Sequence, residues 1–293
     1  MAIIPEQFMN AVVAIGIEKF DADGKRIWIG SGFIVERKEL QNSNFSTYYI
    51  ITNKHVIGNL RQIFMRFNSL SGTFVKDYNI NLYDNMGHPL FSAHPNQNTD
   101  IIAIQFTPQA LISDMSIWNA FEINTHTLTL EQMQRTGVEE GSLVYALGFP
   151  MNLVYEIKSP ICRLGCISRI RDAFLLAQNT PIFLIDAQTF PGNSGGPIIS
   201  RPEPLSIMGT PSNNSSNLIG ILSAYLPYKD VLISQQTGEV QMVQTENSGL
   251  TVVHPVDRIK EVVEMEWRRN EQIRLSQQPQ KFPSLIKSEG ATV

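Results

Sequence analysis

This chain of 293 residues has enough apolar residues for a large folded core, since 43% of them are hydrophobic and only 17% are charged. The composition excludes a disordered chain and a coiled coil, and the length suits two packed domains or one large β-rich unit. With 23 Lys and Arg against 27 Asp and Glu, the formal net charge of -4 gives no basic field, so we expect no nucleic-acid partner.

The N-terminal segment has none of the features of a secretory signal. No Lys or Arg precedes the apolar run from Ala11 to Ile17, which is short. A signal peptide needs a basic segment, a longer apolar segment and a small-residue cleavage site. No other stretch approaches the roughly 20 apolar residues of a membrane-spanning helix. The sequence therefore predicts a cytoplasmic protein that does not associate with membranes.

Short β-type runs, separated by Gly, Pro, Asn and Asp at turn positions, recur along most of the chain. They fall into two groups without regular alternation of strand and helix, and the boundary lies within residues 113–139. This pattern is typical of antiparallel barrels or sandwiches. The predicted strands are Val12–Glu18, Trp28–Val35, Tyr48–Thr52, Gln62–Phe67, Asp100–Phe106, Ser142–Gly148, Ile161–Ile167, Ile182–Asp186, Pro197–Ile199, Leu218–Ala224, Val240–Gln244 and Leu250–Val253.

Two runs of the first group carry residues suited to acid-base chemistry. Residues 48–57 read YYIITNKHVI, a β-rich run that ends in a polar turn presenting His55, and the segment GSGF at 30–33 precedes it. Residues 98–104 read NTDIIAI, which places Asp100 at the mouth of an apolar strand. An imidazole and a carboxylate are the base and the orienting group that a nucleophilic mechanism requires.

Both cysteines lie in the predicted strand Ile161–Ile167. At about 3.3 Å per residue, the Cα atoms of Cys162 and Cys166 would be roughly 13 Å apart, beyond the roughly 7 Å span of a disulfide. With no second pair of ligands nearby, they do not form a four-ligand zinc site. We therefore expect two reduced cysteines and no bound metal.

The strongest local signal is DAQTFPGNSGGP at residues 186–197, where a serine stands among glycines. Glycines let the backbone turn tightly and approach a substrate that side chains would obstruct. The Ser194 hydroxyl could attack a carbonyl while the amides of Gly192 and Ser194 bind the oxyanion. Taken alone, the segment is equally well an ordinary glycine-rich turn. Together, however, His55, Asp100 and Ser194 follow the chain order of one known catalytic triad.

The periodicity becomes helical after Pro255. Apolar residues recur at helical spacing among charged ones, which predicts one amphipathic helix over residues 256–275 that packs on the β-structure. The residues of this apolar stripe are Val256, Ile259, Val263 and Trp267. Residues 276–293 are polar and contain proline, so we expect a flexible tail there.

Four ordered motifs make this chain similar to the trypsin-like serine endopeptidases, particularly the bacterial and plant HtrA/Deg branch. The family pattern GSGF, TNxHV, TDIAxI and PGNSGGP reads GSGF, TNKHV, TDIIAI and PGNSGGP here, and the resemblance spans roughly residues 10 to 265. It implies an all-β fold of two antiparallel six-stranded β-barrels with the C-terminal helix. The first barrel, residues 1–122, would carry His55 and Asp100, and the second, residues 123–255, would carry Ser194.

The resemblance also implies a role for each of these residues. Ser194 is the nucleophile, His55 is the general base and then the acid, and Asp100 holds the imidazole tautomer. The amides of Gly192 and Ser194 form the oxyanion hole. The implied reaction is hydrolysis of peptide bonds in a polypeptide substrate through an acyl-enzyme intermediate, with no cofactor.

Substrate preference is implied by two further segments. Gln188, six residues before Ser194, occupies the position that forms the floor of the primary pocket in trypsin-like enzymes. An uncharged floor disfavours a strict preference for Lys or Arg. The segment Ser223, Ala224 and Tyr225 matches the strand that pairs with an extended peptide, and Thr251 would line the same pocket. We expect an uncharged, small or medium side chain before the scissile bond.

The chain departs from the HtrA/Deg pattern in having no PDZ module after the second barrel and no trimerising N-terminal extension. We therefore expect a monomer, regulated by the helix, the tail or a regulatory protein partner. One alternative is a protease-fold binding protein or adaptor that is catalytically silent, or latent until a partner activates it. A minor alternative is a serine esterase, since Ser194 also fits a GxSxG elbow followed by Asp230 and His254.

Overall fold

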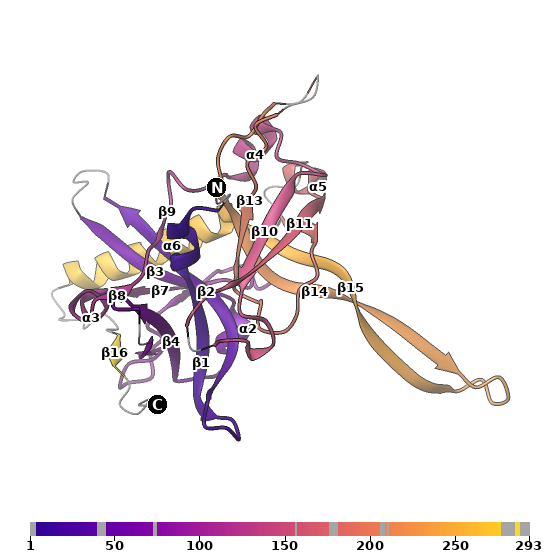
Figure 1. Cartoon of the computed structure of the whole chain (residues 1–293), viewed down its shortest axis with the longest axis horizontal. Coiled ribbons are helices and arrows are strands. Elements are labelled where there is room, and N and C mark those ends of the chain that lie inside the picture. The colour runs from indigo at the N-terminus through magenta and orange to yellow at the C-terminus, as the bar shows by residue number, and fades with distance from the viewer. Residues whose placement is uncertain are drawn as a thin grey trace.

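The computed structural model describes residues 4–39, 45–72, 75–155, 157–175, 181–205, 209, 211–276 and 285–287. Two β-units lie side by side, a long helix packs across both, and a two-stranded hairpin projects from the second (Figure 1). No helix among these residues is long and apolar enough to cross a membrane.

The first unit is a ten-stranded sheet with the hydrogen-bonded order β16-β5-β4-β1-β2-β3-β7-β6, with β8 paired to β4 and β9 paired to β2. All its pairs are antiparallel except β2 with β9. The short helices α1 (Glu6–Ala11), α2 (Lys54–Ile57) and α3 (Gln109–Ser113) interrupt the strands. The strands are β1 (Val12–Phe20), β2 (Arg26–Lys38), β3 (Ser46–Thr52), β4 (Gln62–Ser69), β5 (Val75–Asn81), β6 (Ser92–Ala93), β7 (Ile102–Phe106), β8 (Ser116–Ile117), β9 (Phe121–Glu122) and β16 (Ile286–Lys287).

The first unit differs from the closed six-stranded barrel that the sequence led us to expect over residues 1–122. The two-residue strand β6 pairs with β7, and the connection before β6 pairs with itself through a bridge between Tyr83 and Pro89. This connection therefore supplies no strand that joins β6 to β5, and the sheet stays open. Residues 286–287, inside the predicted flexible tail, pair with β5 instead. The rest of that tail, beyond Ser276, is described only at Leu285.

The second unit is a closed barrel with the strand order β10-β11-β12-β15-β14-β13, as predicted from the second group of β-type runs. Each pair is antiparallel. Three short helices, α4 (Leu130–Thr136), η1 (Pro150–Asn152) and α5 (Arg171–Leu175), lie between its elements. Its strands are β10 (Leu143–Gly148), β11 (Ile161–Arg169), β12 (Phe183–Asp186), β13 (Pro197–Ser200), β14 (Leu218–Ile233) and β15 (Val240–Pro255).

The β14–β15 hairpin is longer than the sequence pattern indicated. The two strands pair from the barrel to Ile233 and Val240, and the outer half projects from the body of the protein (Figure 1). Side chains of both strands are exposed there, including the pairs Val231 with Val243 and Leu232 with Met242. Asp230 pairs with Gln244 in this outer half.

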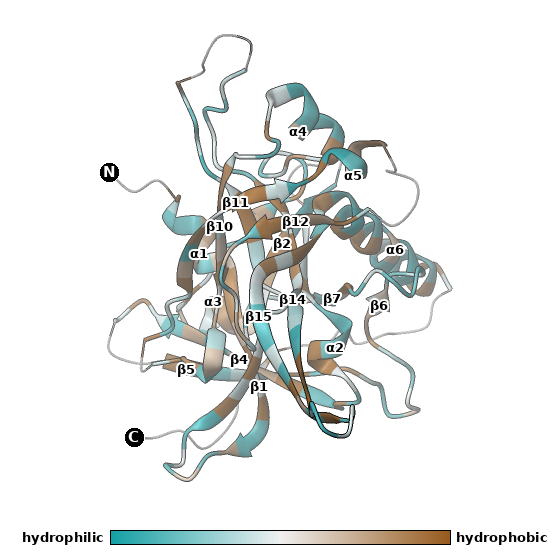
Figure 2. Cartoon of the chain, turned by 90° about the vertical axis from the view of Figure 1, so that its right-hand side faces the viewer, coloured by the Kyte–Doolittle hydropathy of each residue, from teal (hydrophilic) through white to brown (hydrophobic). Residues whose placement is uncertain are grey.

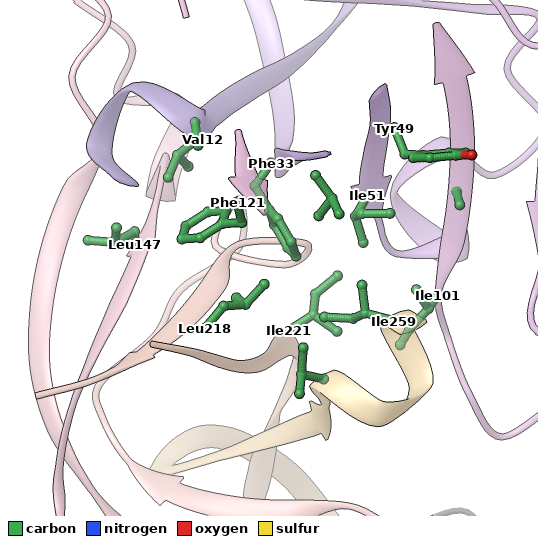
Figure 3. Packing of buried hydrophobic residues seen from close by; sticks show 14 of the residues in the cluster. Val12, Phe33, Tyr49, Ile51, Ile101, Phe121, Leu147, Leu218, Ile221 and Ile259 are labelled. Atoms are coloured by element: carbon green, nitrogen blue, oxygen red, sulfur yellow. The ribbon is translucent and has the colours of Figure 1, made fainter. Parts of the chain in front are cut away.

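A single apolar cluster joins both units to the C-terminal helix. Phe33 and Phe121 of the first unit meet edge to face, with ring centroids 5.7 Å apart, beside Leu147 and Leu218 of the second (Figure 3). Ile259 enters the same cluster from the helix. Burying a large apolar side chain contributes roughly 1.5 to 3 kcal/mol. The two units therefore share part of their core.

The predicted C-terminal helix, α6, spans Val256–Leu275 and packs on β7 and β14. Val256, Ile259 and Val263 of its apolar stripe are buried and Trp267 is partly buried, while the side seen in Figure 2 is mainly hydrophilic. The guanidinium of Arg37, on β2, lies 3.9 Å from the ring centroid of Trp267 and 3.1 Å from the carboxylate of Glu264. These contacts attach the helix to the first sheet.

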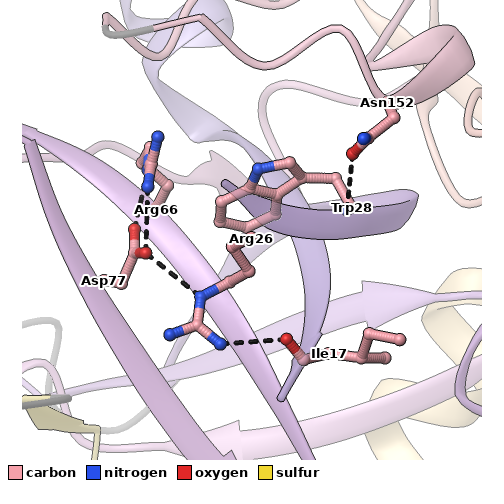
Figure 4. A network of polar contacts seen from close by, with 6 residues as sticks. All are labelled: Ile17, Arg26, Trp28, Arg66, Asp77 and Asn152. Carbon is pink, nitrogen blue, oxygen red and sulfur yellow. Dashed lines mark hydrogen bonds and ion pairs between the residues drawn. The ribbon is translucent and has the colours of Figure 1, made fainter. Parts of the chain in front are cut away.

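A buried ionic network ties the strands of the first sheet together (Figure 4). The carboxylate of Asp77 accepts hydrogen bonds from Arg66 Nε at 2.7 Å and Arg26 Nε at 3.2 Å. Near it, the side-chain oxygen of Asn152 in the second unit accepts the amide of Trp28 at 2.6 Å. The carboxylate and the two guanidinium groups satisfy one another here, and removing one partner of such a buried pair costs several kcal/mol.

A buried lysine connects the second unit to the first. Lys158 is only 3% exposed, and its Nζ donates to the carbonyl of Val12 at 2.7 Å and of Asn10 at 3.4 Å. Its backbone exchanges two hydrogen bonds of 2.7 Å with the side chain of Asn68. No carboxylate among the residues described here forms an ion pair with this ammonium group. Burial lowers the pKa of Lys158 to about 7.

This lowered pKa predicts that Lys158→Met stabilises the protein most at low pH. The unfolded lysine titrates near its usual pKa and binds the proton more tightly than the folded one, so the wild type gains stability as pH rises from about 7. Between pH 6 and pH 9 the amount by which the free energy of unfolding of Lys158→Met exceeds that of the wild type should shrink by about 2 to 3 kcal/mol. Urea unfolding of both proteins at these two pH values measures it, and a pH-independent difference would contradict the prediction.

Candidate active site

The imidazole of His55 is held in one orientation by Asp100. His55 lies in α2, directly after β3, and its side chain is half exposed. One carboxylate oxygen of Asp100 accepts the backbone amide of His55 at 3.1 Å, and the other is hydrogen-bonded to His55 Nδ1. A carboxylate can only accept, so Nδ1 carries the proton and Nε2 is left with a free lone pair. This tautomer can act as a base.

The backbone of Asp100 is fixed on both sides. Its carbonyl accepts the side-chain amide of Asn53 at 2.6 Å, and its N–H donates to Nε2 of His254 at 3.3 Å. Asn53 precedes His55 in the turn after β3, whereas His254 comes from β15 of the second unit. The sequence motif TNKHV contains Asn53, but no sequence signal pointed to a supporting role for His254.

The loop that carries Ser194 presents two unused amides. The amides of Asn193 and Gly195 donate to the carbonyls of Phe190 and Leu222 at 3.0 and 2.9 Å. Among the described residues, the amides of Gly192 and Ser194 have no acceptor. Buried or half-buried N–H groups without an acceptor are rare in proteins, and at a catalytic serine they are the donors for an oxyanion.

The glycines of this loop are required by its close approach to backbone of the first unit at Gly195 and of the second unit at Gly192. A Cβ on Gly195 would lie 2.1 Å from the carbonyl oxygen of Ser31 and 2.4 Å from Oγ1 of Thr52, both in the first unit. A Cβ on Gly192 would lie 2.5 Å from the carbonyl oxygen of Phe149. Both glycines have positive φ, 98° at Gly192 and 85° at Gly195, which other residues adopt with strain.

Ser31, in the GSGF segment, connects the two units at this loop. Its hydroxyl donates to the carbonyl of Gly192 at 2.6 Å and accepts the amide of Phe149 at 2.9 Å. Its amide donates to the carbonyl of Ser194 at 2.9 Å. In the sequence this segment is recognisable only as part of a motif, and nothing there indicates these contacts across the units.

The structure brings both Ser194 and the His55 helix close to Gly30. A Cβ on Gly30 would lie 2.5 Å from the side chain of Val56 and 3.4 Å from the carbonyl of Ser194. Ser194 Oγ donates to the carbonyl of Ser223 at 3.0 Å. Within the part of the chain that the structure describes, no hydrogen bond joins Ser194 to His55.

The residues expected to contact substrate differ in exposure, and Ser223 among them lies beside Ser194. Gln188 and Ala224 are exposed, Tyr225 is half-buried and Ser223 is buried. Beyond Leu222, the edge of β14 that pairs with β13 has no further strand partner among the described residues. This edge is therefore free to pair with an extended peptide.

Thr251 supports the predicted pocket from behind rather than lining an open surface. It is fully buried, and its hydroxyl is hydrogen-bonded to that of Thr189 at 2.7 Å and to the carbonyl of Ala187 at 3.0 Å. Asn247 completes this wall by donating to the carbonyl of Thr189 at 2.5 Å. Burial in a β-ladder, which spacing alone did not show, accounts for the difference.

The geometry required for the esterase alternative is absent. Ser194 leads into the strand β13 rather than into a helix. Asp230 lies in the projecting hairpin, and His254 contacts the backbone of Asp100 rather than Ser194. No group of three or more His, Cys, Asp or Glu side chains in the described ranges could hold a metal ion.

The chain is similar to one known protein family and, at low sequence identity, to solved structures. A model of the trypsin-like peptidase domain matches residues 30–203. The apo form of the MamO protease domain from Magnetospirillum magneticum has 16% sequence identity and a TM-score of 0.48, with 87% of this chain and 96% of that chain covered. The inactive form of Rv3671c protease has 13% identity and a TM-score of 0.41, with 88% and 89% covered. No curated protein matches the chain.

The match to the family model extends from the GSGF segment past Ser194 and covers more than half of the sequence. It includes the loop at Ser194 and both residues of the His55–Asp100 pair. The chain therefore belongs to the trypsin-like peptidase family.

Proposed function

We propose that this protein is a serine endopeptidase that cleaves polypeptides through Ser194, His55 and Asp100. The observation that carries the proposal is the pair of unused amides, at Gly192 and Ser194, on the loop that presents the Ser194 hydroxyl. A glycine-rich turn with a purely structural role has no reason to leave both N–H groups without an acceptor. The oriented His55–Asp100 pair supports the same assignment.

In the proposed reaction, the Ser194 hydroxyl attacks the carbonyl carbon of the scissile bond. Its proton moves to Nε2 of His55, and Asp100 stabilises the resulting imidazolium. The amides of Gly192 and Ser194 donate to the developing oxyanion. The tetrahedral intermediate collapses when Nε2 gives its proton to the leaving amine, which leaves an ester between Ser194 and the acyl half of the substrate.

Water completes the cycle by the reverse sequence of proton transfers. His55 takes a proton from the water molecule that attacks the ester carbonyl, and the same two amides stabilise the second oxyanion. The proton returns to Ser194 as the carboxylate product leaves. In both halves the substrate would lie extended along the free edge of β14 at Ser223, Ala224 and Tyr225.

A latent protease-fold protein is the second candidate. The hydrogen bond from Ser194 Oγ to the carbonyl of Ser223 favours it, because the hydroxyl then donates to that carbonyl instead of to His55. In this case a partner or the substrate itself would have to redirect the side chain before attack. Labelling of Ser194 by a fluorophosphonate distinguishes the two, since an active serine reacts in the isolated chain.

Removing a member of the triad should abolish activity. Ser194→Ala and His55→Ala should each lower kcat/KM for a polypeptide by about ten-thousand-fold or more, because the nucleophile and its base act as one unit. Degradation of casein and fluorophosphonate labelling measure the effect. The matched control is Asp230→Asn, an exposed carboxylate in the projecting hairpin, which should retain activity. Equal cleavage by wild type and Ser194→Ala would reject the assignment.

The side chain at position 188 should influence the residue preferred before the scissile bond. Gln188→Asp places a carboxylate where trypsin-like enzymes recognise a basic side chain, and a charged hydrogen bond favours Lys or Arg by about tenfold or more. Proteomic cleavage profiles of wild type and variant measure the shift. Gln188→Asn, the uncharged control, should keep the wild-type preference. Identical profiles for Gln188→Asp and the wild type would show that residue 188 does not face this side chain.

A further inference from the structure

A buried histidine of the second unit contacts the backbone of the proposed catalytic aspartate. His254 lies on β15, paired with Ile221 of β14, and is 3% exposed. Its Nε2 accepts the N–H of Asp100, which belongs to the first unit, at 3.3 Å. The proposed reaction does not use His254, and its contact crosses from one unit to the other.

The strands around His254 also support the nucleophile. Leu222 of β14 pairs with Val253, the neighbour of His254, and the carbonyl of Leu222 accepts the amide of Gly195 at 2.9 Å. The same pair of strands thus holds the Ser194 loop through Leu222 and the Asp100 backbone through His254. Because the two parts of the triad come from different units, a shared support fixes their separation.

The hydrogen bond requires one protonation state of His254. Nε2 can accept the Asp100 N–H only when it carries no proton, so the proton of the neutral ring must be on Nδ1. Nδ1 is buried and has no hydrogen-bond partner among the described residues. A buried donor without an acceptor costs about 1 to 3 kcal/mol. A role in packing alone gives no reason to accept this cost, because an apolar side chain would fill the same space without it.

The surroundings keep His254 neutral. Burial is the largest effect and lowers the pKa of His254 to about 4, against the attraction of Asp100. His94, before β7, and Arg258, on α6, also disfavour a positive charge on His254 and lower its pKa. Both of these groups bond to Glu261 of α6, His94 at 2.7 Å and Arg258 at 2.6 Å. Near neutral pH the acceptor at Nε2 is therefore present.

We propose that His254 is a positioning residue that attaches Asp100 to the second unit and so sets the separation between the His55–Asp100 pair and Ser194. This inference rests on the proposed peptidase function. Loss of the bond leaves the Asp100 backbone held by Asn53 and its carboxylate held by His55, both within its own unit. The His55 ring can then shift relative to Ser194, and a misplacement of about 1 Å costs roughly a hundredfold in rate.

Three variants separate positioning from packing. His254→Leu keeps an apolar side chain of similar size but removes the acceptor, and His254→Gln restores an acceptor oxygen at about the distance of Nε2. His254→Leu should lower kcat for peptide hydrolysis by about 10- to 100-fold with little change in KM. His254→Gln should recover most of this loss. Arg258→Gln, a matched change in the neighbouring charge cluster, should keep kcat within about twofold.

A second measurement does not depend on activity. The proton on His55 Nδ1 gives a downfield NMR resonance that reports its bond to Asp100. This resonance should be broadened or moved in His254→Leu and return towards its wild-type position in His254→Gln. If the wild type showed this resonance but cleaved no peptide, the proposed function would be rejected. The resonances of His254→Leu and His254→Gln would still test the positioning role.

Two results would overturn the inference. One is an unchanged kcat and an unchanged His55 resonance in His254→Leu. The other is a stronger loss of kcat in His254→Gln than in His254→Leu, because the polar side chain would then be harmful and packing alone would matter. Urea unfolding of each variant at pH 7 shows whether a change in kcat comes from a smaller folded fraction.

Discussion

The polar groups of Ser31 form the junction on which the geometry of the site depends. Its amide and hydroxyl donate to the carbonyls of Ser194 and Gly192, and its carbonyl accepts the hydroxyl of Thr52 at 2.7 Å. Ser31 is fully buried, so each of these groups would be costly if it lost its partner. The first unit therefore holds the nucleophile loop of the second by directed bonds, in addition to the apolar core that the units share.

The peptide units of the nucleophile loop are fixed by their carbonyls, which explains why two of its amides are free. The N–H of Gly192 shares a peptide unit with the carbonyl of Pro191, which accepts the amide of Met151 at 2.7 Å. The N–H of Ser194 shares a peptide unit with the carbonyl of Asn193, which accepts the amide of Gly196 at 2.9 Å. Neither unit can rotate to satisfy its own N–H without losing that bond, so both donors stay oriented for a developing charge, which is the physical content of electrostatic preorganisation.

The sequence predicted those parts of the molecule that local chemistry determines. The segments at His55, Asp100 and Ser194 are short, and each couples a strand to a turn, while the periodicity after Pro255 indicated helix α6 without further context. The open first sheet could not be predicted, because it depends on which distant edge pairs with β5. The burial of Lys158, Thr251 and His254 could not be predicted for the same reason. Their hydrogen-bond partners, a backbone carbonyl for Lys158, a hydroxyl for Thr251 and a backbone amide for His254, come from segments far away in the chain.

The hydrogen bond between Ser194 Oγ and the Ser223 carbonyl can be weighed against the catalytic effect expected of the triad. Redirecting the hydroxyl to His55 requires a change between staggered rotamers and the exchange of one neutral hydrogen bond, worth about 0.5 to 1.5 kcal/mol. That difference corresponds to about a tenfold effect on rate at most, whereas a triad and its oxyanion donors supply many powers of ten. In peptidases without bound substrate, catalytic hydrogen bonds are often loose and tighten when the reacting carbonyl enters the site. A latent form would need a larger obstacle than this bond, such as displacement of the Asp100 backbone or of the Ser194 loop, and both are held here by partners from the opposite unit.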